Sequence, residues 1–224
     1  MSLSAIPRGA FAPSPYPAER WLKRAFYLAC AALAGWLLWR AAYPQRPFEA
    51  DWVNKELGRW SLRFLFVCLL LSPLSRLLRR PAWRRWRRPL GLMAFAFAAI
   101  HTVHFLLYGR IWPHRMAIVV QRPYLAIGLV ALILFAPLAA TSNDAVVRWM
   151  TPRRWRLLHG AVYPAAALSV VHEVMAYARL IGEAGLYCAL VVLLLAAKAW
   201  RETGAGRGRA APPVSKIRDS IAVG

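Results

Sequence analysis

The feature that most constrains this chain is a series of six long apolar stretches. At 1.5 Å of helical rise per residue, about twenty residues cross the roughly 30 Å hydrocarbon core of a bilayer. Inside that core the backbone must pair its own polar groups, which a helix does within one segment. The sequence therefore predicts an all-α integral membrane bundle of six transmembrane helices, near residues 21–43, 59–78, 89–108, 123–141, 155–178 and 182–200.

Composition agrees with a membrane location. Of 224 residues, 59% are hydrophobic and only nine are acidic, which is too apolar for a soluble domain of this size. We expect a cytoplasmic N-terminal segment over 1–20, one transmembrane domain over 21–200 and a disordered cytoplasmic tail over 201–224. The first apolar stretch could be mistaken for a signal peptide, but prolines precede it and no clean cleavage site follows, so we expect it to stay as a helix.

The positive charges predict the orientation of the helices. Lys and Arg number 30 and give a net charge of +21, which in a soluble protein would indicate nucleic-acid binding, but here they flank the apolar stretches. Because cytoplasmic loops are enriched in Lys and Arg, the second and fourth connections should face the cytoplasm, and both termini with them. Eleven arginines carry this prediction: Arg76, Arg79, Arg80, Arg84, Arg85, Arg87, Arg88, Arg148, Arg153, Arg154 and Arg156.

Three of the histidines within the apolar stretches are candidate ligands, His101 in the third stretch and His159 and His172 in the fifth. An imidazole in hydrocarbon needs a hydrogen-bond partner or a metal, because unsatisfied polar atoms are costly there. Both stretches run in the same direction, and His101 and His172 lie about 18 Å and about 25 Å from the cytoplasmic end at ideal helical rise. We predict that these two are the axial ligands of one b-type haem in the outer half of the membrane.

His159 lies near the cytoplasmic end of its stretch, level with Arg87. A second haem, or none, is expected there. Because arginine stays protonated and is a very poor iron ligand, such a haem would be bound by His159 alone, with Arg87 pairing a propionate or acting as an indirect partner. His159 and His172 point about 140° apart on an ideal helix, although Pro164 between them can kink it. The alternative for each histidine is a polar residue that hydrogen-bonds across helices.

Two polar residues lie beside the predicted ligands. His104 follows His101 by three residues, on nearly the same face, and is either a rival ligand or a solvated neighbour. We prefer His101 because it is deeper in the membrane. Glu173 adjoins His172, and it either orients that ligand or reaches for the outer interface.

Short motifs follow one another along the chain in a specific order and spacing. They are Gly58-Arg59-Trp60, Ser72-Pro73-Leu74, Arg87-Arg88-Pro89-Leu90-Gly91-Leu92, Arg122-Pro123-Tyr124, Thr141-Ser142 and Trp155-Arg156-Leu157-Leu158-His159. In these motifs the chain resembles the MsrQ (YedZ) haem-binding membrane subunits, within the ferric-reductase-like transmembrane superfamily. The resemblance implies that His101, His159 and His172 bind haem, and that Arg87 stands where the similar NADPH oxidases have a further histidine.

The resemblance also implies an electron-transfer subunit more than a stand-alone enzyme. Such a subunit takes electrons from a cytoplasmic flavin reductase or a membrane quinol and passes them to MsrP, a periplasmic molybdenum-cofactor enzyme that repairs methionine sulfoxide. Flavin mononucleotide (FMN) is attributed to the family as well; the sequence has no glycine-rich phosphate loop, so FMN would have to use the basic cytoplasmic rim. Two alternatives stay open: an independent ferric or metal reductase, and a non-redox transporter or scaffold whose histidines join helices.

Overall fold

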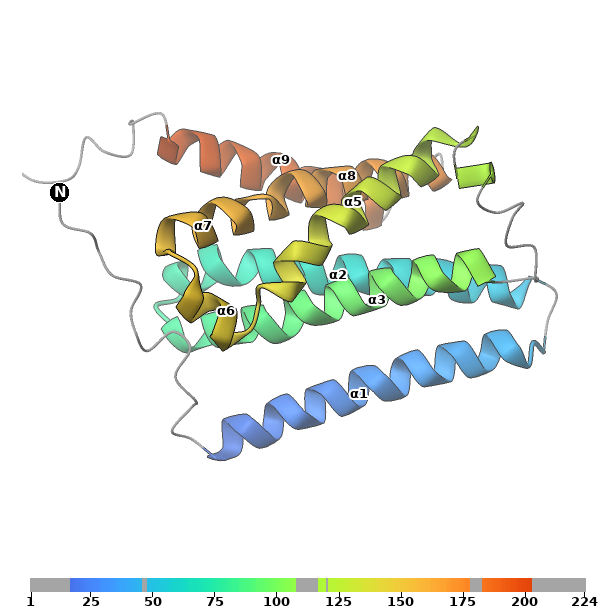
Figure 1. The fold of residues 1–224 in the computed structure, drawn as a ribbon, viewed down its shortest axis with the longest axis horizontal. Coiled ribbons are helices and arrows are strands. Elements are labelled where there is room, and N and C mark those ends of the chain that lie inside the picture. Colours follow the sequence, from blue (N-terminus) through green and yellow to red (C-terminus); the bar gives the residue numbers. More distant parts are fainter. Residues whose placement is uncertain (1–16, 46–47, 108–116, 120, 178–182, 203–224) are drawn as a thin grey trace, which may run out of the picture.

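The computed structural model describes residues 17–45, 48–107, 117–119, 121–177 and 183–202, and this part of the chain is helical (Figure 1). The predicted all-α fold is confirmed. Most of the predicted N-terminal segment and tail lies outside the described residues. The main elements are α1 (Pro17–Ala42), α2 (Glu49–Leu77), the 3-10 helix η2 (Pro81–Trp86), α3 (Arg87–Leu107), α5 (Pro123–Ala140), α6 (Asp144–Trp149), α7 (Pro152–Gly160), α8 (Val162–Tyr177) and α9 (Glu183–Glu202).

Four helical segments of the described chain are long and apolar enough to cross a membrane. A shorter apolar helix, Glu183–Ala197, lies within α9, and the fifth predicted span is divided between α7 and α8. Large apolar side chains such as Leu77 (78% exposed) point outward, as a lipid-facing surface requires. The chain is therefore a helical membrane protein; six spans and cytoplasmic termini stay predictions. The four segments are Ala18–Ala42, Glu49–Leu77, Pro81–Leu107 and Pro123–Ala140.

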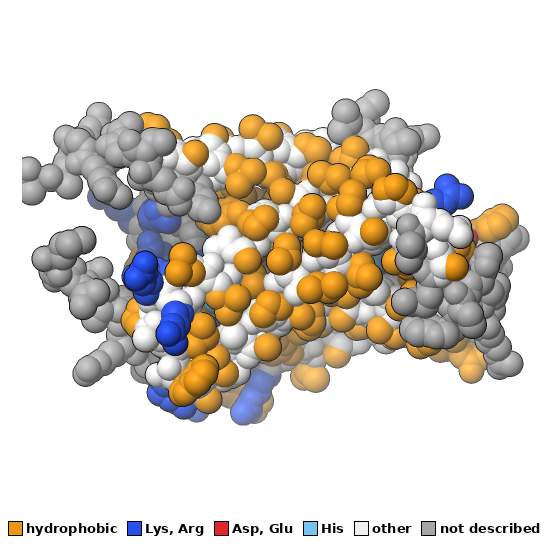
Figure 2. Space-filling model, turned by 45° about the horizontal axis from the view of Figure 1, so that its top comes forward, with side chains coloured by type: hydrophobic (Ala, Val, Ile, Leu, Met, Phe, Trp, Pro, Cys, Tyr) orange, Lys and Arg blue, Asp and Glu red, His pale blue; other side chains and the backbone are white. Residues whose placement is uncertain are grey.

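Basic side chains gather at one end of the bundle, which we call the arginine end: η2, the start of α3, α6 and α7. On the face shown in Figure 2, apolar side chains cover the middle, and Lys and Arg gather mainly at this end. Arg88 of α3 pairs with Asp144 of α6 at 2.6 Å, and Arg85 of η2 pairs with Glu19 of α1 at 2.8 Å. The arginine-rich connection therefore also links elements that are distant in sequence.

The fifth predicted span is broken where the sequence places a proline. α7 ends at Gly160, and the N–H of Ala161 donates to Leu158 O at 2.9 Å in a tightened last turn. Pro164 has no N–H to donate to the carbonyl of Gly160, so the regular ladder is interrupted there and α8 begins anew. The sequence allows a kink at Pro164, and the structure has a break in this span just before that residue. Pro73 and Pro137, in contrast, lie within α2 and α5 as these helices continue.

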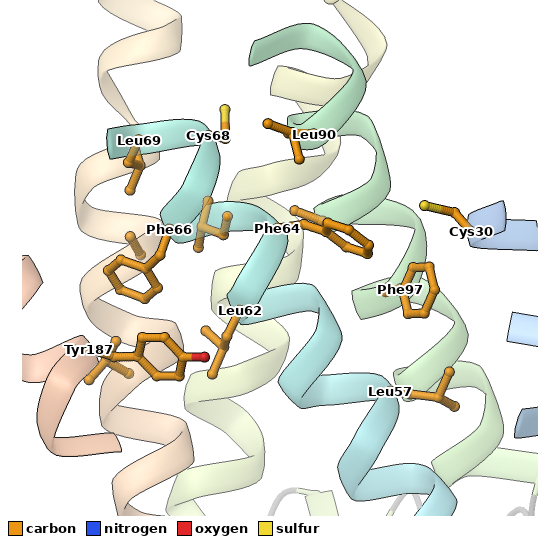
Figure 3. Packing of buried hydrophobic residues seen from close by; sticks show 14 of the residues in the cluster. Cys30, Leu57, Leu62, Phe64, Phe66, Cys68, Leu69, Leu90, Phe97 and Tyr187 are labelled. Atoms are coloured by element: carbon orange, nitrogen blue, oxygen red, sulfur yellow. The ribbon is translucent and has the colours of Figure 1, made fainter. Parts of the chain in front are cut away.

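The core is centred on α2, which places successive apolar side chains against its neighbours (Figure 3). Phe64 meets Phe97 of α3 edge to face, with ring centres 5.3 Å apart, while Phe66 stacks on Tyr187 of α9 at 4.7 Å. The most extensive helix contacts join α2 to α3 and α5 to α8. The bundle thus contains two closely packed helix pairs, and each pair carries one of the predicted ligands.

Candidate functional site

A cavity of about 390 Å³ lies between the two helix pairs, and we call its surroundings the cavity end. His101 of α3 and His172 of α8 both line it. Much of the remaining wall is apolar, with side chains such as Leu132 and Phe135. Ser61, also in the wall, donates its hydroxyl to the carbonyl of Ala94 at 2.7 Å, so this buried hydroxyl is satisfied without either histidine.

The two histidine rings face each other across helices. Their ring centres are 6.3 Å apart, and their planes are inclined by 77°. An imidazole nitrogen binds a metal at about 2 Å and lies about 1.1 Å from its ring centre, so two axial imidazoles have centres roughly 6 Å apart. The spacing of His101 and His172 fits two ligands on opposite sides of one iron, and the apolar wall suits a porphyrin. The residues of the cavity therefore fit haem.

Each ring is held by a backbone carbonyl of the neighbouring helix. His101 Nδ1 lies 2.8 Å from Asn54 O of α2, and His172 Nδ1 lies 2.6 Å from Tyr124 O of α5. A carbonyl oxygen can only accept a hydrogen bond, so Nδ1 must carry the proton in both rings. In the neutral imidazole this leaves Nε2 with a free lone pair. Fixing the tautomer in this way is how proteins prepare a histidine to bind a metal through Nε2.

The two polar neighbours of the ligand pair have other partners. His104 Nδ1 lies 3.1 Å from the side-chain oxygen of Asn54, and the ring is not among those that line the cavity. Glu173 lines the cavity but does not hold His172 through Nδ1, because the Tyr124 carbonyl occupies that position. A backbone carbonyl, and not Glu173, therefore orients His172 through Nδ1.

His159 and Arg87 lie at the arginine end and are not part of the cavity wall. His159 stacks on Trp155 with ring centres 4.1 Å apart, and its Nε2 lies 3.1 Å from Thr141 Oγ1. Thr141 Oγ1 also lies 2.7 Å from Pro137 O, so this hydroxyl at the end of α5 is hydrogen-bonded both within its own helix turn and to His159 of α7. Arg87 is close enough to His159 for its charge to act on that ring. The structure thus brings His101 and His172 together and leaves His159 apart from them.

Several groups that shape the site could not be identified from the sequence. The carbonyls of Asn54 and Tyr124 are backbone atoms and leave no trace in the sequence. Gly128 of α5 also lines the cavity, directly beside the His172 ring. An isolated glycine inside an apolar helix is the one available signal, because such a residue lowers helix stability, but it is a weak one, since Gly35 of α1 has no close neighbour at its Cβ position.

The fold and the site define a helical membrane protein with paired histidines between its spans, and the comparisons agree. Residues 57–170 match the family described as ferric reductase like transmembrane component. A relative from Xanthomonas oryzae pv. oryzae (strain MAFF 311018) is 34% identical over 209 residues, which cover 88% of this chain and 94% of the relative. Another, from Klebsiella pneumoniae (strain 342), is 35% identical over 185 residues, covering 80% of this chain and 91% of the relative.

A third relative, from Polaromonas naphthalenivorans (strain CJ2), is 32% identical over 203 residues, covering 85% of this chain and 92% of the relative. All three carry the name protein-methionine-sulfoxide reductase heme-binding subunit MsrQ. The chain belongs to the MsrQ family of ferric-reductase-like membrane proteins. The resemblance seen in the sequence motifs is confirmed.

Proposed function

We propose that this chain binds one b-type haem between His101 and His172 and carries electrons across the membrane to a methionine sulfoxide reductase. The observation that carries the proposal is the paired arrangement of two imidazoles, 6.3 Å apart, each with Nδ1 committed to a carbonyl and Nε2 left to bind iron. The b type is supported by the three cysteines, since none forms the Cys-x-x-Cys-His motif that attaches haem covalently.

The chain's own residues orient the ligands and exclude water. The carbonyls of Asn54 and Tyr124 hold the two rings, and this hydrogen bond raises the basicity of each ligating nitrogen. Apolar side chains such as Leu132 and Phe135 keep the local polarity low, which influences a redox potential. When bound, haem supplies the reversible one-electron chemistry of its iron.

The proposed partners lie on opposite sides of the membrane. The name of the relatives supports a methionine sulfoxide reductase as electron acceptor, and we propose that it is a periplasmic, molybdenum-containing MsrP. The donor would be a cytoplasmic flavin reductase or a membrane quinol. The arginine end supports a cytoplasmic position for that half in a bacterial inner membrane, and it is where FMN would bind if the chain holds one.

We propose that His159 joins helices instead of binding a second haem. Its Nε2 is hydrogen-bonded to Thr141 Oγ1 of the neighbouring helix, and one face of its ring is stacked on Trp155. The proposed stoichiometry is therefore one haem per chain, and Arg87 has no propionate to pair.

The decisive experiment is haem quantification per chain together with an anaerobic redox titration of the detergent-purified protein. The wild type should contain one low-spin haem. His101→Ala and His172→Ala should each lose it, because both are ligands of the same iron. His104→Ala is the matched control, on the same helix as His101 but outside the cavity wall, and should keep it. Full haem content with an unchanged reduced spectrum in either ligand variant would contradict this pairing.

A second candidate function is favoured by the family description alone: an independent reductase of ferric ions. The two functions differ in the electron acceptor. Chemically reduced protein should be reoxidised rapidly by purified MsrP and slowly by chelated Fe(III) if the first proposal is correct. The reverse order of rates would favour the ferric reductase.

A further inference from the structure

We propose that Gly58 and Gly128 are positioning residues that seat the two histidine rings, an inference that rests on the proposed haem site. Each ring donates a hydrogen bond to a backbone carbonyl of the neighbouring helix and lies against a glycine four residues further along that helix. For His101 the pair is Asn54 O and Gly58 on α2, and for His172 it is Tyr124 O and Gly128 on α5. The same device therefore occurs twice, once in each helix pair.

Helix geometry explains the spacing of four. In an α-helix the residues i and i+4 lie one above the other on the same face, and the side chain of i+4 covers the turn that precedes it. A ring that donates Nδ1–H to the carbonyl of residue i must therefore lie against residue i+4. A Cβ at residue i+4 would project into that space, so glycine leaves the most room for the ring.

The distances show how little space remains. A Cβ on Gly128 would be 2.7 Å from His172 Nδ1, 2.9 Å from its Cε1 and 3.1 Å from its Cγ. These three are the nearest atoms, and all belong to the ring that the Tyr124 carbonyl holds at 2.6 Å. The ring cannot retreat without lengthening that hydrogen bond, so an alanine at residue 128 displaces the ligand.

Gly58 makes the same contact less tightly. A Cβ there would be 3.3 Å from His101 Nδ1 and 3.4 Å from its Cε1, so a shift of a few tenths of an ångström accommodates it. Other helical glycines have no such role: a Cβ on Gly35 of α1 meets nothing within 4 Å, and one on Gly91 of α3 meets only Cys68 Sγ at 3.7 Å. Gly35→Ala and Gly91→Ala are therefore matched controls.

The first test compares haem binding in the full chain. Gly128→Ala should release haem to an excess of haem-free acceptor protein about 10–100-fold faster than wild type, the range found when the hydrogen-bond partners behind a metal ligand are changed. Its low-spin electron paramagnetic resonance signal, which reports the orientation of axial imidazoles, should also shift. Gly58→Ala should show a smaller change in both, and the two controls none. Wild-type release and an unshifted signal in Gly128→Ala would overturn the proposal.

The second test measures the effect of the glycine in the absence of haem. It is a double-mutant cycle in which the thermal unfolding of the haem-free protein is followed. Gly128→Ala should lower Tm when His172 is present. In the His172→Ala background it should leave Tm unchanged or raise it, because the ring that met the Cβ is gone and alanine favours helix. An equal loss of Tm in both backgrounds would show that Gly128 is needed only for helix contact, whatever binds in the cavity.

The second test distinguishes failure of this inference from failure of the proposed function. If the wild type binds no haem, the proposed function is wrong, yet the cycle still decides whether the glycine seats the ring. If Gly128→Ala does not accumulate in membranes, Gly58→Ala tests the proposal instead, because its Cβ contact is less tight and the variant should still fold. An unshifted signal and wild-type haem release in Gly58→Ala would then overturn the proposal.

Discussion

The cavity end and the arginine end of the bundle each hold histidine in membrane-buried helices but use it differently. At the cavity end, His101 and His172 donate Nδ1–H to backbone carbonyls and keep Nε2 for a ligand. At the arginine end, His159 is hydrogen-bonded through Nε2 to Thr141 Oγ1 and stacks on Trp155. The choice of nitrogen, which depends on the partner that a neighbouring helix presents, separates a candidate ligand from a residue that joins helices.

The largest expected effect concerns which side of the membrane each end faces. A reporter that is active only in the cytoplasm, fused after Arg201, should work, while one that requires the periplasm should be silent. The physical reason is the excess of arginine in the second and fourth connections. A working periplasmic reporter at this position would place the arginine end outside and reverse the proposed electron path.

Replacing one histidine at each end should give opposite results. His172→Ala should lose nearly all haem, because the proposed axial imidazole is removed, and with it the hydrogen bond to Tyr124 O that orients it. His159→Ala should keep one haem per chain and the wild-type reduced spectrum, since its ring is outside the cavity wall. Haem per chain, measured on purified protein, checks both. Haem loss in His159→Ala would instead indicate that His159 also binds haem, so that the two ends would not differ in function.

A smaller effect is expected from the partner of His159. Thr141→Val should destabilise the protein by about 1 kcal/mol, because the hydrogen bond between Thr141 Oγ1 and His159 Nε2, which joins two helices, is lost. Thermal unfolding in detergent measures this change, and the haem spectrum should not move. Ser142→Ala is the matched control, since its hydroxyl donates only to Leu138 O at 2.6 Å within the α5 turn. Equal destabilisation by both variants would argue against a special bond to His159.

The smallest effect is expected at Asn54. Asn54→Ala removes the side-chain oxygen that His104 contacts at 3.1 Å but retains the carbonyl that anchors His101 at 2.8 Å. Haem content should stay at the wild-type level, with a loss of stability below about 1 kcal/mol. Haem release kinetics provide the measurement. A large loss of haem would mean that His104, not the backbone of α2, controls the site.

The sequence predicts the features that depend on composition and on single positions. Apolar length gives the helical membrane fold, and depth along two parallel stretches selects His101 and His172, which the structure brings together. The sequence allows a kink at each of Pro73, Pro137 and Pro164, because proline lacks the N–H, but only contacts in the structure show that the break lies beside Pro164.

What depends on contacts between helices could not be predicted. The sequence does not show that Thr141 of the α5 terminus meets His159 of α7, so it left His159 as a possible ligand. Nor does it show which carbonyl receives each Nδ1–H, and for that reason the isolated Gly128 had no meaning before the structure. Hydrogen-bond partners across helices follow from rotation and tilt, which apolar periodicity does not determine.

The division of the bundle into two helix pairs has a consequence for biogenesis. His101 belongs to the pair of α2 and α3, and His172 to the pair of α5 and α8. A group bound by both would be a cross-link between hairpins that enter the membrane one after the other. Insertion of the cofactor would then be the final step of maturation, and the supply of haem would decide how much of the newly made chain escapes degradation.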